Sequence, residues 1–477
     1  FSILKELRKE GIMISRVGDV EENGKEWLEE YYREIVYPVL TPMAVDASRP
    51  FPFLMNRSLN LAVELINNEG QHSRGFVQVP SVLPRIIEVE RCSQRTFVFL
   101  EEVIIIHCQD LFKGCEILDI VPFRITRDSD LDVDEEDMEN LLKEIEISLR
   151  KRKRGASVRL EILKTRNQSI KKFLAENLDL TEQAIYEING PLDVTCFFKF
   201  IKLLNEPKWE FEPFVPQKPL ELPKLDNLFD RIREHDILFH HPYESFEAVI
   251  KLVSDAANDP NVLAIKQTLY RVSGNSPIVG ALAKAAENGK QVTVLVELKA
   301  RFDEENNIIW ARRLEKAGCH VIYGLMGLKT HAKIILIVRK EPDGIKRYVH
   351  LGTGNYNDNT AKLYTDIGLM TANDQFGSDA SAFFNLLSGY SDPPVWNKLV
   401  MAPLGLRQKL YELIDNEITQ VKKGHEGHII AKMNSLIDKE ITKKLYEASM
   451  GGVKIELIVR GICGLKPGLP GISENIT

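Results

Sequence analysis

The sequence has few cysteines and no long apolar run, and both absences narrow the class of protein. The six cysteines contain no CxxC pair: Cys92, Cys108, Cys115, Cys196, Cys319 and Cys463. This distribution argues against a disulfide framework and a structural zinc site, and it favours a reducing, cytoplasmic compartment. No apolar run is long enough to span a bilayer and no signal-peptide pattern is present, so a transmembrane segment is not expected. Association with a membrane surface stays open.

Two common nucleotide-binding motifs are also missing. The segment Gly324–Thr330 contains Gly, Lys and Thr, but Lys329 does not directly follow Gly327 as a P-loop requires. The segment Gly352–Asn357 reads G-x-G-x-x-N and lacks the third glycine of a dinucleotide fingerprint. The sequence shows no cluster of metal ligands either, so any Mg²⁺ would have to arrive with the phosphates of a bound ligand.

The composition is that of a globular protein, with 44% hydrophobic and 27% charged residues in 477 positions. This length suggests about three domains. Because the net charge is -7, the surface as a whole is not suited to nucleic acid. An anionic substrate would need a local basic funnel.

The first part of the chain mixes helical and strand-like patterns. Residues 1–35 are predicted to be helical and charged, and Leu59–Leu65 and Thr96–Leu100 are predicted strands. An acidic segment, Asp128–Glu139, leads into a predicted helix over Leu141–Leu149. The basic run that follows suits the end of a helix dipole, and contact with a polyanion is the alternative.

A proline-rich segment, Pro207–Pro223, is predicted to be a linker. After it, apolar strands alternate with helical stretches. The expected strands are Val262–Thr268, Val292–Glu297, His320–Tyr323, Ala332–Val338 and Arg347–Leu351. Such alternation predicts a largely parallel sheet with both faces covered.

A weak internal repeat relates two parts of this region. At a shift of 163 residues, Leu282 meets Leu445, Gly289 meets Gly452, and a strand beginning at Val292 meets one beginning at Ile455. Each copy is a helix, a glycine and a buried strand. Two unrelated helix–strand units would also fit, but two similar α/β halves are the better interpretation.

The most informative motif is Gly327–Lys333, which contains His331-Ala332-Lys333 at the start of a predicted strand. Because residues two apart on a strand share a face, the histidine and the lysine should point together. A neutral imidazole is a competent nucleophile, and an ammonium group binds phosphoryl oxygens. A histidine at a strand edge beside a solvated lysine is the alternative.

The Gly352-Thr353-Gly354-Asn355 turn comes after a hairpin and adds to this motif. Small residues there let backbone N–H groups close on an anion. The order of H-x-K, hairpin and G-T-G-N resembles the phospholipase D superfamily, whose pattern is H-x-K followed by G-S-x-N. Members of that superfamily form a covalent phosphohistidine between two similar halves.

Two arginines end predicted strands in the same region, Arg271 and Arg301. Ligands of open α/β sheets bind at the carboxyl ends of strands, where arginine suits phosphate oxygens. Simple salt bridges are the alternative, since Asp303 is close to Arg301 in sequence. The segment His240-His241-Pro242-Tyr243 could line a site, but it is better explained as the entry to a helix. His350 is a candidate supporting residue near the site.

Seven longer strings resemble the bacterial-type polyphosphate kinase family across nearly the whole chain. They are YPVLTPMAVDASRPFPF, FRITRDSDLDVDEEDMENL, IKQTLYRV, VELKARFDEENNI, GLKTHAKI, HLGTGNYNDNTAKLYTDIGL and LIVRGICGLKPGLPGISENI. The resemblance implies an ATP:polyphosphate phosphotransferase, which reversibly transfers the γ-phosphoryl group of ATP to the end of a polyphosphate chain. It implies ATP, ADP and polyphosphate as partners, Mg²⁺ with the ATP, a homo-oligomer and no nucleic acid.

The same resemblance assigns roles to individual residues. His331 becomes the phosphohistidine, with Lys333 beside it in the catalytic pair. Arg271 and Arg301 are the Mg²⁺-associated arginines, although a guanidinium has no lone pair, so they should act through phosphate oxygens or water. Phosphate or nucleotide binding is implied for Tyr364, Arg460 and Asn355.

The resemblance also implies an α/β fold class: an α+β head domain followed by two similar phospholipase D-like halves, the second truncated. The expected divisions are 1–15 (remnant of a helical domain), 16–216 (head), 217–398 (first half) and 399–477 (start of the second half). The family's second catalytic histidine would fall at position 494 under the repeat offset, beyond Thr477. We therefore expect these residues to be part of a longer protein and to be inactive alone.

Two other function classes stay open from the residues themselves. One is a phospholipase D-like phosphodiesterase, which would hydrolyse phosphodiesters without forming ADP. The other is a binding module for polyanions, which would never acquire label from ATP. The family strings outside the H-x-K region favour the kinase.

Overall fold

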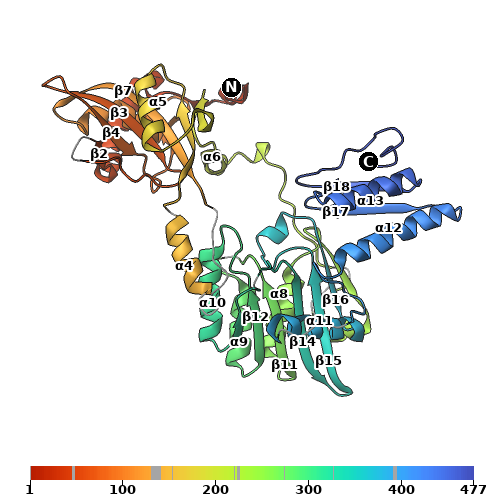
Figure 1. Ribbon diagram of the computed structural model, residues 1–477. Helices are drawn as coiled ribbons and strands as arrows, with labels where there is room; N and C mark the ends of the chain where they lie inside the picture. Colours follow the sequence, from red (N-terminus) through yellow and green to blue (C-terminus); the bar gives the residue numbers. More distant parts are fainter. Residues whose placement is uncertain are drawn as a thin grey trace. The chain divides into compact units, whose positions relative to one another are not determined.

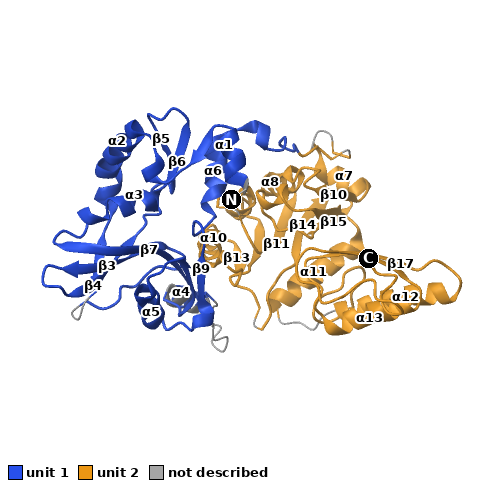
Figure 2. Ribbon diagram, turned by 90° about the horizontal axis from the view of Figure 1, so that it is seen from above, with its two compact units in different colours: residues 1–215 blue, residues 216–477 orange. Residues whose placement is uncertain are grey.

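A computed structural model describes residues 2–45, 49–129, 141–152, 154–219, 221–222, 226–272, 274–325, 327–389 and 395–477. The chain forms two compact units, residues 1–215 and 216–477 (Figure 2). Most of the predicted acidic segment lies outside the described residues, and so do the side chains of Arg150, Lys151 and Arg152 in the basic run.

The first unit contains two sheets. The larger has the order β2-β4-β3-β7-β8-β9 and the smaller the order β1-β6-β5. The strands are β1 Ile12–Ile14, β2 Pro42–Val45, β3 Leu59–Asn67, β4 His72–Gln78, β5 Ile86–Val89, β6 Arg95–Phe99, β7 Cys115–Arg127, β8 Ser157–Leu163 and β9 Ile185–Ile188. The helices are α1 Ser2–Lys9, α2 Glu22–Tyr31, α3 Leu100–Ile106, α4 Leu141–Arg152, α5 Gln168–Asn177 and α6 Cys196–Leu204.

The prediction of helix throughout residues 1–35 is wrong in part. The first helix stops before Gly11, whose φ of 77° lies in the left-handed region that favours glycine. The following apolar triplet is then free to pair in parallel with β6, so that Ile12 lies opposite Arg95. A partner distant in sequence therefore overrides the local helical pattern.

The second unit is built on one mixed sheet with the order β10-β16-β15-β14-β11-β12-β13 (Figure 1). Its strands are β10 Ile237–His241, β11 Val262–Leu269, β12 Gln291–Val296, β13 His320–Ile322, β14 Lys333–Glu341, β15 Gly344–Gly352 and β16 Asp366–Thr371. Its helices are α7 Leu228–Glu234, α8 Glu247–Asn258, α9 Pro277–Glu287, α10 Glu304–Lys316 and α11 Asp374–Gly389.

The prediction of a largely parallel sheet is wrong, because four of the six strand pairings in this sheet are antiparallel. Strands β11, β12 and β13 are parallel neighbours, as crossover helices require. Strand β14 runs antiparallel to β11, and β14, β15, β16 and β10 continue as antiparallel neighbours. The change follows from the hairpin between β14 and β15, where Glu341 pairs with Gly344 across a two-residue connection. The α/β class itself is confirmed.

Both faces of the central sheet are covered. Helix α11 packs Phe383, Phe384 and Leu387 against Ile334 and its neighbours on β14 and β15. The alternate residues of β14, such as Ile335 and Ile337, are also fully buried and therefore fill the opposite face.

A second parallel pair follows in residues 399–477. It comprises α12 Leu406–Lys422, β17 His428–Met433, α13 Lys439–Met450 and β18 Lys454–Val459. Its order of strand, helix and parallel strand matches β11–α9–β12. The two similar halves predicted from the repeat therefore share this β-α-β unit.

Candidate functional site: the end of the central sheet around His331

The histidine and lysine of the H-x-K motif lie at the start of β14 on one side of the chain. The rings of His331 and Tyr270 meet edge to face at 4.8 Å, and Lys333 Nζ lies 5.1 Å from the centre of the same tyrosine ring. Ile334 points the other way into the core beneath α11. This agrees with the alternation predicted for a strand.

A threonine on the neighbouring strand fixes the backbone between these side chains. Thr268 Oγ1 donates to the Ala332 carbonyl at 2.7 Å and accepts from Ile334 N at 3.1 Å. Because both bonds go to main-chain atoms, the start of β14 is held against β11 whatever the neighbouring side chains do. The imidazole is thereby presented from a rigid strand end.

The electrostatic surroundings keep the His331 imidazole neutral. Burial lowers the pKa of His331, and the positive charges of Lys333, Lys329 and Arg271 lower it further. A histidine with a pKa below its ordinary value has a free nitrogen lone pair at neutral pH. The site therefore presents an uncharged imidazole within a group of cations.

Lys333 is almost fully buried, with 6% of its surface exposed. Burial lowers the pKa of Lys333 to about 8, although Asp366 opposes the shift. Its ammonium donates to the carbonyl of His331. The lysine is thus close to losing its proton near neutral pH, and binding of an anion would favour its charged form.

A buried carboxylate supports the segment before His331. Glu297, 2% exposed, follows directly on β12. Its two oxygens accept from Thr330 N at 2.7 Å and from Lys299 N at 2.9 Å. Burial raises the pKa of Glu297, against the effect of these two N–H groups and of two nearby lysines.

A buried asparagine ties two strand ends together beside this carboxylate. Asn307 Nδ2 donates to the carbonyls of Tyr270 and Glu297, each at 2.8 Å. Sequence reasoning assigned no role to Glu297 or Asn307. The available signal was a carboxylate at the end of an apolar strand, followed by an amide in the first turns of the next helix.

Arg271 lies near His331, as its effect on the His331 pKa shows. Its Nε is 2.8 Å from an Asp303 carboxylate oxygen, and its Nη2 donates to the Arg301 carbonyl at 3.1 Å. The salt-bridge alternative is therefore real for Arg271, but the same bonds also orient its fork beside the histidine. The roles of both arginines in binding stay a prediction.

The Gly352-Thr353-Gly354-Asn355 turn is joined to the lysine through Asp366. Thr353 Oγ1 donates to one Asp366 oxygen at 2.9 Å. A Cβ added to Gly354 would lie 2.4 Å from the other oxygen, so only glycine allows this approach. Since Asp366 also acts on the pKa of Lys333, the two predicted motifs meet at this carboxylate.

The two residues predicted to contact nucleotide touch each other. The Arg460 guanidinium lies 4.8 Å from the centre of the Tyr364 ring. Its Nε and Nη2 donate to Asn434 Oδ1 at 3.0 and 2.8 Å. Residues almost a hundred positions apart are thereby combined into one exposed, flat and cationic surface.

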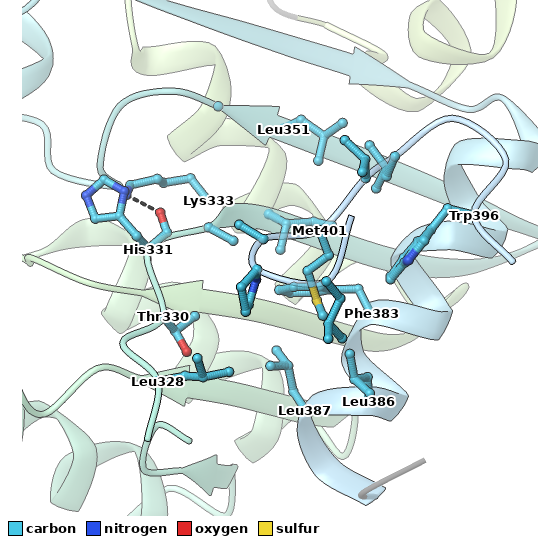
Figure 3. Close-up of a pocket in the computed structure, with 18 of the residues that line it drawn as sticks. Leu328, Thr330, His331, Lys333, Leu351, Phe383, Leu386, Leu387, Trp396 and Met401 are labelled. Carbon is cyan, nitrogen blue, oxygen red and sulfur yellow. Dashed lines mark hydrogen bonds between the residues drawn. The ribbon is translucent and has the colours of Figure 1, made fainter. Parts of the chain in front are cut away.

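A cavity of about 1010 Å³ begins at Thr330, His331 and Lys333 and extends over the α11 face of the sheet. Figure 3 shows the His331 ring at one end, turned away from Phe383, Trp396 and Met401. The wall is mostly apolar, with leucine the commonest residue, and such a lining does not suit a polyanion. The chemistry therefore belongs to the cationic side of His331 and not to this apolar space.

Among the described residues, no group of three or more His, Cys, Asp and Glu side chains is placed to hold a metal ion. Within the same ranges, no helix combines the length and hydrophobicity needed to cross a bilayer.

Three family models match consecutive parts of the chain. They are the polyphosphate kinase middle domain over residues 23–200, C-terminal domain 1 over 227–393 and C-terminal domain 2 over 399–477.

Two curated relatives match the chain over its whole length. The polyphosphate kinase of Halalkalibacterium halodurans is 53% identical over all of this chain and 68% of its own length. That of Bacillus anthracis is 52% identical over 99% of this chain and 69% of its own length.

Among solved structures, the polyphosphate kinase of Porphyromonas gingivalis superimposes with a TM-score of 0.84 and 32% identity. The match covers 99% of this chain and 70% of that one. By sequence, by domain order and by fold, the chain belongs to the polyphosphate kinase family.

Proposed function

We propose that this protein transfers the γ-phosphoryl group of ATP reversibly to the end of a polyphosphate chain, with His331 as the intermediate carrier. The observation that carries the proposal is a neutral imidazole surrounded by Lys333, Lys329 and Arg271 at the end of a rigid strand. Family membership supports the substrates, since the relatives are named polyphosphate kinases.

The reaction then has two displacements. An imidazole nitrogen of His331 attacks the γ-phosphorus, an N–P bond forms, and the bond to the bridging oxygen breaks so that ADP leaves with the electron pair. A terminal oxygen of polyphosphate next attacks the phosphoryl group, which breaks the N–P bond and forms a new phosphoanhydride. Splitting the transfer in this way is the usual advantage of a covalent intermediate.

The cations stabilise charge that is already present on the phosphates. Lys333 contributes a compact ammonium, while Arg271 and Arg301 contribute planar forks that match phosphate oxygens. Because Lys333 is buried, its charge acts in a lower local dielectric and is less screened than a surface charge. Asn355 and the backbone of its turn are suited to bind the same oxygens.

Mg²⁺ belongs in this scheme as part of the MgATP substrate. The two arginines cannot coordinate a metal, because a guanidinium has no lone pair to donate. They fit the phosphate oxygens around such an ion, and the ion itself would neutralise β- and γ-phosphate charge. Tyr364 and Arg460 offer a surface on which a base can stack.

The proposal is tested by incubating the intact protein with γ-³²P-ATP and no polymer. We expect stoichiometric ADP and protein-bound label that is stable in base and labile in acid, and a polyphosphate chase should move that label into polymer. Hydrolysis of an added phosphodiester to a monoester and an alcohol, without ADP formation from ATP, would favour a phosphodiesterase. Polymer binding without any label would favour a binding module.

A further inference from the structure

Two buried histidines lie next to the G-T-G-N turn on neighbouring parts of the sheet. His241 ends β10 and is 4% exposed, and His350 lies in β15 and is 2% exposed. The Nε2 atom of each has no hydrogen-bond partner among the described residues, and neither has Asn355 Oδ1. Leaving one such buried group unsatisfied costs about 1–3 kcal/mol, so three together require an explanation.

The three atoms belong to residues that line one small cavity. It is bordered by His241, His350, Asn355, Asp366 and Gly368, and it offers about 10 Å³ to the centre of a water molecule. That space corresponds to a single water.

Gly368 creates this space in the middle of the sheet. It lies on β16 between β10 and β15, paired with Phe239 on one side and Gly352 on the other. A Cβ at this position would lie 3.0 Å from His350 Nε2 and 3.6 Å from His241 Nε2. Both imidazole nitrogens therefore face the volume that a side chain would fill.

The hydrogen bonds on the far side of each ring decide what the Nε2 atoms offer. His241 Nδ1 is 2.8 Å from the Glu244 carbonyl, which only accepts, so the proton sits on Nδ1 and Nε2 has a lone pair. His350 Nδ1 is 2.9 Å from the Tyr356 hydroxyl.

Tyr356 is buried, so its hydroxyl proton needs an acceptor, and donation to His350 Nδ1 leaves the His350 proton on Nε2. Burial also lowers the pKa of His350 to about 3, which keeps this ring neutral.

We propose that one ordered water occupies this cavity and positions Asn355, accepting from His350 Nε2–H and donating to His241 Nε2 and Asn355 Oδ1. The three unpaired side-chain atoms are then satisfied, and the water makes three bonds, as buried waters typically do. The network connects β10 and β15 to the turn that follows β15. His241 and His350 are therefore positioning residues, and only the effect on turnover rests on the proposed function.

This assignment differs from two other roles for the pair. A second phosphoryl carrier would need access to ATP, and His350 is only 2% exposed. A metal centre would need a third ligand, and no group of three is found in the described ranges.

The direct test is an experimental structure of the intact protein at a resolution that shows other buried waters. We expect one peak within about 2.6–3.2 Å of the three atoms. Gly368→Ala should remove the peak and shift Asn355, since its added methyl group occupies the site. Gly280→Ala is the matched control, because a Cβ there meets nothing within 4 Å. A wild-type cavity without density overturns the proposal, and so does an anomalous signal from a bound metal.

The functional test compares two substitutions at the same histidine. His241→Gln can place an amide atom near the lost Nε2, whereas His241→Leu cannot. We expect the Leu variant to lower kcat by about tenfold, the Gln variant to recover most of it, and KM for ATP to change little in both. Combined with Asn355→Ala, the Leu substitution should add little, because both act through one water. Additive effects, or equal losses in the Gln and Leu variants, contradict the positioning role. A wild-type protein without kinase activity would contradict the proposed function but leave the density test intact.

Discussion

Residues 216–477 contain two β-α-β units, the first formed by β11, α9 and β12 and the second by β17, α13 and β18. The two have the same local plan but different surroundings. Strands β11 and β12 are parallel neighbours, and so are β17 and β18, each pair joined by a helix. β14 and β13 flank the first pair, and its strands are mostly buried. The second pair forms a two-stranded sheet, in which Ile430 and Ile458 are 68% and 59% exposed. The local sequence pattern therefore specifies the strand–helix–strand order, whereas the burial of its strands depends on whether further strands pair beside them.

The same difference separates the chemistry of the two units. Each places functional residues after its strands: Arg271 after β11, Glu297 after β12 and Arg460 after β18. Next to the first β-α-β unit, β14 pairs with β11 and adds His331 and Lys333 to the same edge of the sheet. The second β-α-β unit contributes Arg460, which lies over the Tyr364 ring.

Replacing His331, the proposed carrier, should have the largest effect on phosphoryl transfer. It tests whether the nucleophile lies beside the first β-α-β unit. His331→Ala should abolish protein-bound label from γ-³²P-ATP, because no imidazole nitrogen is left to form the N–P bond. His428→Ala in the second unit is the control, since its ring only pairs with Glu456 at an exposed edge. The carrier assignment is falsified if His331→Ala still labels fully.

Exchanging arginine for lysine compares the strand-end cations of the two units. Arg271→Lys and Arg301→Lys should each reduce kcat/KM by about 10- to 100-fold, because the charge remains but the fork is lost. Arg460→Lys should cost less, about 3- to 10-fold, since stacking on Tyr364 is partly retained. Arg231→Lys, an exposed pair with Glu234, serves as the control. Near-wild-type kinetics for the first two variants would support plain salt bridges instead.

The pH dependence of kcat/KM should follow the titration of His331 and Lys333, which lie beside the first β-α-β unit. The pKa of His331 is lowered, so the attacking imidazole loses activity only at acid pH, below the ordinary histidine range. The pKa of Lys333 is lowered to about 8, so kcat/KM should fall as pH rises through about 8 and the ammonium loses its proton.

Lys333→Arg should move this alkaline limb to higher pH, because arginine stays protonated. Lys454→Met in the second unit should leave the profile unchanged, since the pKa of Lys454 is raised by Glu456 and the group is exposed. A limb that stays near pH 8 in Lys333→Arg would assign it to another group.

The N-caps of α9 and α13 should give the smallest difference between the two β-α-β units, measured as the loss of stability on replacement by alanine. Asp438 at the start of α13 accepts from Glu440 N at 3.0 Å and Ile441 N at 2.9 Å. Ser276 at the start of α9 accepts from Val279 N at 3.4 Å. Replacement by alanine should cost about 1 kcal/mol for Asp438 and about 0.5 kcal/mol for Ser276. Hydrogen exchange of the first-turn amides measures each loss locally, and equal losses would show that cap geometry does not decide the difference.

Much of this site was predictable because strand alternation and strand ends are local properties. The pattern around His331 correctly predicted that the histidine and lysine share a side of β14. It could not predict Glu297, Asn307 or Asp366, whose partners lie on other elements far along the chain. The same limit applies to His241, for which the sequence favoured the entry to a helix over a place in the lining of a site.

The sequence by itself determined the family, the α/β class, the repeated β-α-β unit, the β14–β15 hairpin and the shared side of His331 and Lys333, since each depends on residues close together in the chain. Tertiary structure alone decided that β1 is a strand, that β14 lies antiparallel to β11, and that β16 and β10 continue the sheet as antiparallel neighbours. It also decided that Arg460 meets Tyr364 and that two histidines face one cavity over Gly368. The physical reason is that strand pairing, burial and side-chain contact depend on partners brought together only by folding.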